Sequence, residues 1–599
     1  MLKDLYTKYK VFVNGIIFSV MPFISFILME FYEHNPFIEI RPVAFLFNIL
    51  LFELLAWIVY VFTGRMKWAV RFILIAAMIF GMINHYVMLF RSTPFVPWDI
   101  FSIKTASSVA GNYDFMPTAR VIIVTVIYIV LVVLAHFMNY RMEMKIKLRL
   151  IPGAIITVVL CLFVSALQNE DFQTDNYLYP FLFTPAYMTK VNGMAVTFAM
   201  DMAYIAVDKP AGYSEENARQ ILDEYKNDDN GQKEDASEGS DTNNNEKMPN
   251  IIVIMDEAFS DLSVLGNFET NKDYMPFVHS LQNGADNTIT GYLNVSVCGG
   301  NTADTEFEFL TGNTMAFLPA GSIPYQQYIK DTTPSLASYL KGLGYETYAQ
   351  HPYNASGWNR ETVYPLLGFE NMAFAPDYLS RDVIRNYISD KTSFEKIIET
   401  YENKPEDKPA FIFNVTMQNH GGYTDTYWNF TNTINAKGLG NDALNQYLSL
   451  IKLTDSDLSS LISYFKEQDE KTIIVFFGDH QPNDTVASSV LAENGMDYSN
   501  LSTEETYSRY QVPYVVWANY DIQEAQNQDM SVNYLAANVL KTAGVPTSDY
   551  QNFLLELQKA YPIISAIRTE DVKADTDEEM LKKYKILQYY RLFDQKGDN

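Results

Sequence analysis

Side chains that can bind a metal ion or carry protons follow three short apolar segments, at the point where each segment ends. Residues 251–255 are followed by Asp256 and Glu257, residues 411–415 by Asn419 and His420, and residues 473–477 by Gly478, Asp479 and His480. A single carboxylate in such a place is usually a cap or turn residue. Three segment ends that carry such groups favour a metal or anion site.

The threonine at position 302 is a second candidate. Gly299, Gly300 and Asn301 lead into a predicted helix that begins near Thr302. Threonine in this place most often caps the helix, and the helix N-terminus also favours a bound anion. A metal ion that removes the hydroxyl proton turns a threonine into a nucleophile. Thr302 is therefore a candidate for both roles.

An α/β fold is expected to position these residues. The three apolar segments and a fourth at 513–517 alternate with stretches of helical periodicity at 333–343 and 448–465. This alternation predicts a mainly parallel central sheet covered on both faces. Ligands of such sheets collect beyond the carboxyl ends of the strands, where the candidates lie. Asp256 is expected to point away from Glu257, because neighbours on a strand face opposite sides.

The first 168 residues predict a membrane domain. Five apolar runs are each close to the ~20 residues that a helix needs to cross the hydrocarbon core. They are residues 11–31, 43–62, 68–90, 121–138 and 150–167. Basic residues collect in alternate loops, namely Lys3, Lys8, Lys10, Arg65, Lys67, Arg141, Lys145, Lys147 and Arg149. The positive-inside rule then places the N-terminus in the cytoplasm and everything after Leu167 outside the cell.

The chain is expected to divide into four parts. They are a five-helix transmembrane domain at 1–168, a juxtamembrane helical segment and disordered acidic linker at 169–249, an extracytoplasmic catalytic domain at 250–562 and a C-terminal tail at 563–599. The linker is rich in Asp, Glu, Asn, Ser and Gly, and this composition cannot bury enough apolar surface to fold.

The composition excludes several classes of protein. The formal net charge of −27 argues against nucleic-acid binding, which needs a basic surface. Cys161 lies in an apolar run and Cys298 lies far from it in the polar part of the chain. Two such cysteines predict neither a disulfide framework nor a zinc cluster.

Several ordered motifs together resemble a known family. In chain order they are the five apolar runs, Asp256-Glu257-Ala258-Phe259, Gly299-Gly300-Asn301-Thr302, Trp358-Asn359-Arg360, Asn419-His420 and Gly478-Asp479-His480. This set resembles the lipoteichoic acid synthase family of phosphoglycerol transferases, in the alkaline phosphatase and sulfatase superfamily. The resemblance implies a sulfatase-like outer domain that is anchored in a bacterial cell membrane.

The resemblance also implies residue roles. The implied ligands of one Mn²⁺ or Mg²⁺ ion are Glu257, Thr302, Asp479 and His480, and the implied substrate-binding residues are Trp358, Arg360, His420 and His351. Three oxygen ligands and one imidazole suit manganese better than zinc. Some family members carry a carboxylate two positions after the residue that matches His351, where this chain has Tyr353.

The implied reaction has two steps. Thr302 would attack phosphatidylglycerol, and diacylglycerol would leave behind a phosphoglyceryl-threonine. A glycolipid or a growing polyglycerol phosphate chain would then take the group. His420 would protonate the departing diacylglycerol and later deprotonate the acceptor.

Other activities stay open at this stage. Sulfatases form their nucleophile in a Cys/Ser-x-Pro-x-Arg context, which the segment after Cys298 lacks. Two-zinc phosphatases need several histidines, and His279, one of four in the outer domain, is expected to be a helix residue. Phosphoethanolamine transferases share the domain plan but usually have a disulfide-bearing outer domain. A hydrolase would use water as the acceptor. All four implied ligand positions are filled, which argues against a non-catalytic membrane scaffold.

Overall fold

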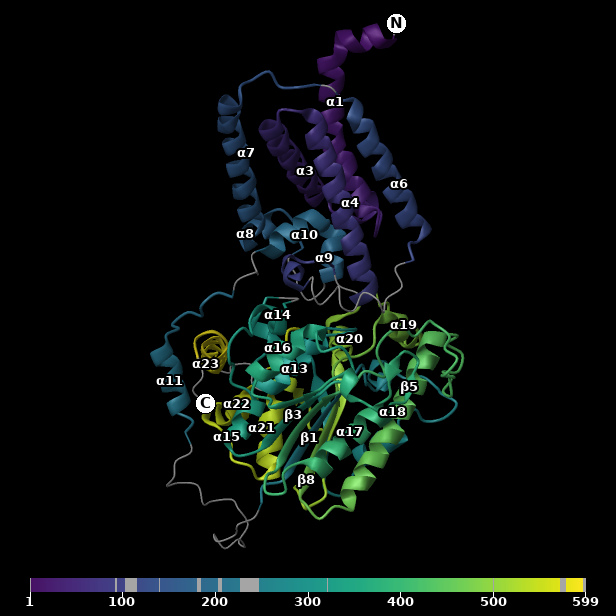
Figure 1. The fold of residues 1–599 in the computed structure, drawn as a ribbon, viewed down its shortest axis with the longest axis vertical. Coiled ribbons are helices and arrows are strands. Elements are labelled where there is room, and N and C mark those ends of the chain that lie inside the picture. Colours follow the sequence, from purple (N-terminus) through teal and green to yellow (C-terminus); the bar gives the residue numbers. More distant parts are fainter. Residues whose placement is uncertain are drawn as a thin grey trace. The chain divides into compact units, whose positions relative to one another are not determined.

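The described residues fall into two compact units. The computed structural model describes residues 2–91, 94–102, 116–138, 140–179, 185–202, 207–226, 247–319, 322–498, 500–570 and 578–595. One unit is drawn from Met1–Ile103 and Val109–Val207, and the other is drawn mainly from Asp208–Asn599 (Figure 1). The predicted acidic linker falls largely on residues 227–246, which lie outside the described residues.

Five long helices form the first unit and confirm the five predicted apolar runs. They are α1 (Leu2–Glu30), α3 (Pro42–Thr63), α4 (Met66–Arg91), α6 (Ala119–Leu134) and α7 (Ile146–Leu167). Each contains a span that is long and apolar enough to cross a membrane. Local signals set their ends: Pro42 begins α3, Gly64 ends it in the left-handed conformation, and Thr118 caps α6 by accepting a hydrogen bond from the Val121 backbone.

Apolar side chains also cover the outside of this helix group. Leu46, Ile123 and Leu162 are each about 60% exposed. Such surfaces are unfavourable in water and are typical of helices that face lipid. The shorter elements of the unit are α2 (Pro36–Glu39), η1 (Pro97–Ser102), η3 (Ala135–Phe137), α8 (Glu170–Asp175), α9 (Pro185–Asn192) and α10 (Met194–Asp201).

An eight-stranded sheet forms the centre of the second unit. Its order is β10-β2-β9-β8-β1-β7-β3-β4. The strands are β1 (Asn250–Asp256), β2 (Thr288–Asn294), β3 (Glu346–Gln350), β4 (Asn371–Ala373), β7 (Ala410–Val415), β8 (Thr472–Gly478), β9 (Gln511–Ala518) and β10 (Met530–Ser531). Only β9 runs antiparallel to its two neighbours. The mainly parallel sheet that the sequence predicted is therefore confirmed.

Helices surround the sheet, and short elements connect them. The longer helices are α11 (Glu215–Asp223), α12 (Pro276–Gln282), α13 (Thr302–Thr311), α15 (Leu336–Gly342), α16 (Arg360–Leu366), α17 (Asp390–Asn403), α18 (Asp442–Lys466), α19 (Asp484–Glu493), α21 (Val532–Ala543), α22 (Asp549–Ala560) and α23 (Glu579–Tyr589). The short elements are η5 (Leu262–Leu265), η6 (Met315–Phe317), α14 (Pro324–Gln327), η7 (Gly357–Asn359), η8 (Ala375–Asp377), β5 (Val383–Ile384), β6 (Tyr387–Ile388), α20 (Thr503–Ser508), β11 (Ile563–Ile564), β12 (Thr569–Glu570) and η9 (Tyr590–Asp594). Both cysteines are free.

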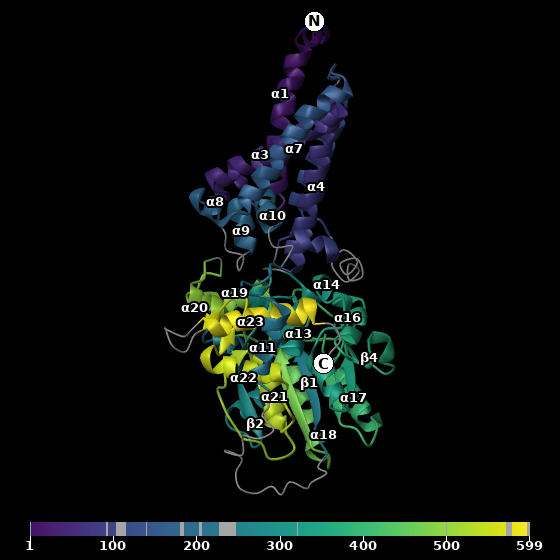
Figure 2. The same ribbon diagram turned by 90° about the vertical axis from the view of Figure 1, so that its left-hand side faces the viewer.

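Different helices cover the two faces of the sheet (Figures 1 and 2). On one face Ile252 and Ile254 of β1 share a core with α18 and α19. On the other face Phe309 of α13 packs against Phe413 of β7 and Phe477 of β8, at ring distances of 5.9 and 5.3 Å. Successive side chains of a strand point to opposite faces, so these buried strands are apolar throughout. The contacts of Phe309 fix α13 across β7 and β8, the strands whose ends carry candidate residues.

Part of the segment predicted as a C-terminal tail packs on this unit. The Gln588 side chain accepts from the Thr314 backbone N–H at 2.8 Å and donates to its carbonyl at 2.9 Å. The Tyr584 hydroxyl donates to the Gly312 carbonyl at 2.8 Å. Residues 578–595 therefore close off the carboxyl end of α13.

His279 of α12 contributes to stability in a pH-dependent way. Its Nδ1 lies 2.9 Å from Asp273 and its Nε2 lies 3.6 Å from Asp261. The Asp261 carboxylate, with help from Asp273 and against the effect of burial, raises the pKa of His279 from 6.5 to about 9. Folding thus favours the protonated ring. This contribution is complete below about pH 6.5 and is lost as the pH rises through about 9.

We therefore expect the unfolding temperature of the wild type to fall more steeply between pH 6.5 and 9 than that of His279→Gln. Circular dichroism melts of the full-length protein at constant ionic strength measure both slopes. Equal slopes would show that the ring does not change its protonation on folding.

Candidate metal centre and active site

Three neighbouring strands deliver side chains to one edge of the sheet. In the strand order β8-β1-β7, Asp256 of β1 lies opposite Gly478 of β8. Met255 of β1 lies opposite Val415 of β7. The three strands therefore end at the same level, and Glu257, Asp479 and His480 meet just beyond them.

The three side chains form a compact, buried cluster. Their ligand atoms all lie within 4.8 Å of one another. His480 Nε2 is 3.3 Å from Asp479 Oδ2 and 3.7 Å from Glu257 Oε1. Burial, and then the charge of Asp479, raises the pKa of Glu257 well above its usual range. Two adjacent carboxylates in such a place are costly unless a cation compensates them.

The unsatisfied atoms of the cluster fit a divalent cation. Asp479 Oδ2 and His480 Nε2 are buried without a hydrogen-bond partner, which is rare for such groups. The other polar atoms of both residues are engaged. Asp479 Oδ1 accepts from the backbone N–H groups of Ala258 and His480, both at 2.7 Å. His480 Nδ1 lies 2.9 Å from the Gln481 carbonyl and donates to it, which leaves a lone pair on Nε2. This is the arrangement that orients a histidine towards a metal.

Thr302 joins the cluster from the start of α13. Its hydroxyl donates to Glu257 Oε2 at 3.4 Å, and its side chain is buried. The expectation that Thr302 caps the helix is wrong: Asn301 is the N-cap, in the left-handed conformation with φ 66°, and Thr302 is the first helical residue. The hydroxyl therefore faces Glu257 instead of the helix backbone. Thr305 Oγ1 donates to the Asp479 carbonyl at 2.8 Å and fixes α13 against the end of β8.

Asp256 lies outside the cluster, as its place on the strand predicts. Its Oδ1 accepts from Asn419 Nδ2 at 2.8 Å and its Oδ2 accepts from Thr416 Oγ1 at 3.0 Å. Thr416 Oγ1 also accepts from the Glu257 backbone N–H at 3.0 Å. Asp256 and Asn419 therefore bind the ends of β1 and β7 together and leave Glu257 to face the site.

Arg360 is held by two residues in the interior. Its Nε and Nη2 donate to Glu306 Oε1 at 3.0 and 2.5 Å, and its Nη1 donates to His351 Nε2 at 3.1 Å. His351 Nδ1 donates to the Val415 carbonyl at 2.9 Å. Both ring nitrogens of His351 are thus engaged within the protein. Burial, and then the charge of Arg360, lowers the pKa of His351 well below its usual range. The geometry makes His351 a residue that holds Arg360 in position.

A strained turn leads into Arg360. Trp358 and Asn359 both have positive φ, at 53° and 62°. Such residues are uncommon outside glycine, and two in succession are found where the surrounding structure requires them. The turn places a half-buried Trp358 two residues before Arg360, which begins α16.

His420 lies in the loop after β7 and is half-buried. Its Nδ1 is 3.0 Å from the Tyr387 hydroxyl, and its backbone carbonyl accepts from Arg385. Burial, and then the charges of Arg385 and His480, lowers the pKa of His420 to about 3. The imidazole is therefore neutral at physiological pH.

Three of these residues were not predicted from the sequence. Glu306 belongs to the same motif as Thr302, four residues further along the helix, so its spacing could have indicated a place on the same face. Arg385 and Tyr387 lie on the β5–β6 hairpin, and no motif marks them.

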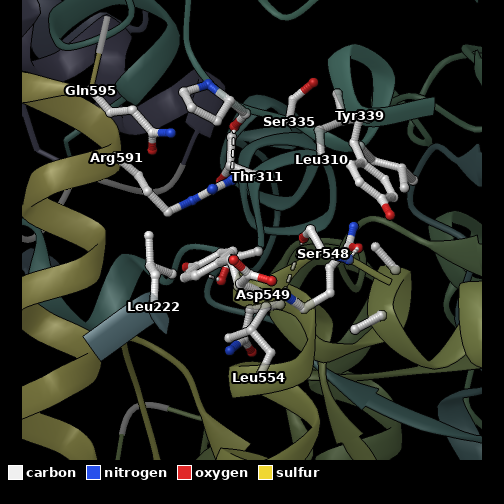
Figure 3. Close-up of a pocket in the computed structure, with 18 residues that line it drawn as sticks. Leu222, Leu310, Thr311, Ser335, Tyr339, Ser548, Asp549, Leu554, Arg591 and Gln595 are labelled. Carbon is white, nitrogen blue, oxygen red and sulfur yellow. Dashed lines mark hydrogen bonds between the residues drawn. The ribbon is translucent and has the colours of Figure 1, made fainter. Parts of the chain in front are cut away.

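A separate cavity lies at the opposite end of α13 (Figure 3). Its volume is about 200 Å³, and Leu310, Thr311 and Gly312 line it together with Asp549 and Arg591. Ten helical residues span about 15 Å, so this cavity is distinct from the cluster around Thr302.

Comparisons with proteins of known sequence place the second unit in a family. Residues 249–545 match the sulfatase family model. A Rhizobium meliloti protein, described as a putative cyclic beta-1,2-glucan modification protein, is 32% identical over 398 residues, which cover 65% of this chain and 57% of that protein. Lipoteichoic acid synthase 1 of Bacillus subtilis is 24% identical over 277 residues, 45% of this chain and 42% of that protein. The matched segments thus span about half the length of these relatives.

A solved structure supports the same fold. The Streptococcus pyogenes phosphoglycerol transferase GacH, in complex with sn-glycerol-1-phosphate, aligns with 64% of this chain and 95% of its own chain, with a TM-score of 0.51 and 21% identity. The match over residues 249–545 and this fold likeness show that the second unit contains a sulfatase-like domain.

Proposed function

We propose that this chain is a membrane-anchored phosphoglycerol transferase. It would move glycerol phosphate from phosphatidylglycerol to a glycolipid or polyglycerol phosphate acceptor, through a phosphoglyceryl intermediate on Thr302. The observation that carries this proposal is the Thr302 hydroxyl, 3.4 Å from Glu257 and beside the buried Asp479–His480 pair. A threonine that only stabilises the fold does not require buried carboxylates and an imidazole around its hydroxyl.

The proposed cofactor is one Mn²⁺ or Mg²⁺ ion held by Glu257, Thr302, Asp479 and His480. A bound divalent cation would lower the pKa of the Thr302 hydroxyl and neutralise charge on the phosphate. The ligand atoms are carboxylate and hydroxyl oxygens with one imidazole nitrogen, a set that suits these ions better than a thiolate-rich zinc site.

The residues around the cluster suit the two proposed steps. After its hydroxyl proton has gone to solvent, Thr302 Oγ1 forms a bond to phosphorus as the bond from phosphorus to the lipid oxygen breaks. Arg360 is fixed by Glu306 and His351 and supplies a positive charge where the phosphate must lie. The negative charge of the incoming phosphate favours the protonated form of His420, which gives a proton to the departing alcohol. The neutral form that results then takes a proton from the acceptor hydroxyl.

The relatives support this choice among the transferases. The proteins that this chain resembles include a lipoteichoic acid synthase and a phosphoglycerol transferase bound to glycerol phosphate. The relative at 32% identity is described as a glucan modification protein, which supports a soluble or membrane-linked glucan as a second candidate acceptor. In either case the proposed location is the bacterial cell membrane, with the N-terminus in the cytoplasm and the second unit outside.

The first test concerns the metal. Because the cation binds the folded cluster, millimolar Mn²⁺ should raise the unfolding temperature of the full-length wild type in detergent. Asp479→Asn removes one charged ligand and should abolish this increase. Asp256→Asn is the matched control, since it changes a neighbouring carboxylate that lies outside the cluster, and it should keep the increase. A shift that persists in Asp479→Asn would place the metal elsewhere.

The second test concerns the nucleophile and the transferred group. Full-length protein in vesicles receives Mn²⁺ and phosphatidylglycerol labelled in its head-group glycerol. The wild type and Thr302→Ser, which keeps a hydroxyl, should each carry a labelled adduct at position 302. Thr302→Ala should carry none and should lose activity by about a thousandfold or more.

The products of the same reaction separate the remaining activities. Labelled glycolipid-linked chains support the synthase, and labelled glucan supports the second acceptor. Free glycerol phosphate as the main product indicates a hydrolase. Labelling only from phosphatidylethanolamine would contradict the proposed donor.

A further inference from the structure

A two-residue hairpin turn beside His420 carries an arginine in a strained conformation. β5 and β6 pair antiparallel, with Ile384 opposite Tyr387, and Arg385 and Asn386 connect them. Arg385 has φ 54°. Two-residue hairpin turns favour glycine where φ is positive, and another residue there costs about 1 kcal/mol or more. The arginine side chain must therefore serve a purpose that glycine cannot.

Arg385 is a buried cation without a carboxylate partner among the described residues. Its side chain is 3% exposed. Nη2 donates to the carbonyls of Gln418, at 2.9 Å, and of His420. Nη1 donates to Gln446 Oε1 at 3.5 Å. These acceptors are all neutral, and a buried charge without a counter-ion is costly.

Aromatic rings surround the guanidinium group in place of a carboxylate. The centroids of Tyr387, Tyr423 and Tyr427 lie 5.6, 5.3 and 5.7 Å from Arg385 Cζ. Cation–π contacts of this kind stabilise a desolvated arginine. Asn429 Nδ2 donates to the Arg385 carbonyl at 3.2 Å and holds the turn in place.

The same turn fixes His420 at two points. Arg385 binds its backbone carbonyl. Tyr387, two residues further on, places its hydroxyl 3.0 Å from His420 Nδ1 and its ring 5.3 Å from the imidazole. With the backbone held and Nδ1 engaged, the direction of the ring is set.

We propose that Arg385 and Tyr387 are positioning residues that hold the His420 imidazole against the leaving oxygen of the lipid alcohol. This inference rests on the proposed function. Thr302 attacks after its hydroxyl proton has gone to solvent. As Oγ1 bonds to phosphorus and the bond to the lipid oxygen breaks, the protonated imidazolium form of His420 passes a proton from Nε2 to that oxygen and becomes neutral. A ring that is free to turn transfers the proton less often, while the nucleophile and the metal cluster keep their geometry.

Two donors with different leaving groups test this proposal. Phosphatidylglycerol releases an alkoxide that needs a proton. A p-nitrophenyl phosphodiester of glycerol releases a phenolate that leaves as an anion. Full-length protein in vesicles is assayed with Mn²⁺ on both. Arg385→Gln and Tyr387→Phe should lower kcat for phosphatidylglycerol by about tenfold to a hundredfold, with the first-turnover release of p-nitrophenolate within about twofold of the wild type.

Tyr427→Phe is the matched control for Tyr387→Phe. Both tyrosine rings contact Arg385, and the Tyr387 hydroxyl also lies 3.0 Å from His420 Nδ1. Tyr427→Phe should keep wild-type rates on both donors. Equal losses on the two donors, or equal losses in Tyr387→Phe and Tyr427→Phe, would show a structural role and overturn the proposal.

A double-mutant cycle tests whether the residues act through His420. In a His420→Gln background, Arg385→Gln and Tyr387→Phe should cause no further loss on phosphatidylglycerol. Losses that add would overturn the proposal. Thermal melts check folding, and if Arg385→Gln does not fold, Tyr387→Phe carries the test. A wild type that releases p-nitrophenolate but never turns over phosphatidylglycerol would instead contradict the proposed function.

Discussion

A buried cluster of two carboxylates and one imidazole is the main constraint on the structure of the second unit. Glu257, Asp479 and His480 lie within ligand distance of one another, and two of their polar atoms have no partner. Such a cluster is unstable by itself, because desolvated like charges repel. It becomes favourable when a divalent cation binds between the groups. The family match and the strand-end position agree with that role.

One helix links this cluster to the rest of the site. α13 begins with Thr302, binds the end of β8 through Thr305 and holds Arg360 through Glu306. Its Phe309 packs on the sheet, and its far end is closed by residues 578–595. The proposed nucleophile, the candidate metal ligands and Arg360 therefore share one rigid support, which is the condition for fixed geometry in a reaction that depends on positioning.

Sequence reasoning found what local patterns encode. Short continuous apolar runs predicted the strands, and apolar runs of about 20 residues predicted the membrane helices. The strand ends predicted where Glu257, Asp479 and His480 meet. It failed where the role of a residue depends on its contacts with other segments of the chain. That Asn301 instead of Thr302 caps α13 depends on the glycine turn before it. Nδ1 of His351 is engaged by Val415, which lies 64 residues further along the chain. Arg385 and Tyr387 carry no motif, because their role arises only when the hairpin packs on the loop after β7.

The central claim is that a single cation sits among these groups with Thr302 as a ligand. Anomalous diffraction at the manganese edge, from crystals of the full-length protein grown with Mn²⁺, tests it most directly. We predict one peak, at about 2.0–2.3 Å from oxygen atoms of Glu257, Asp479 and Thr302 and from His480 Nε2. Two peaks, or one peak that Thr302 does not reach, would contradict the account.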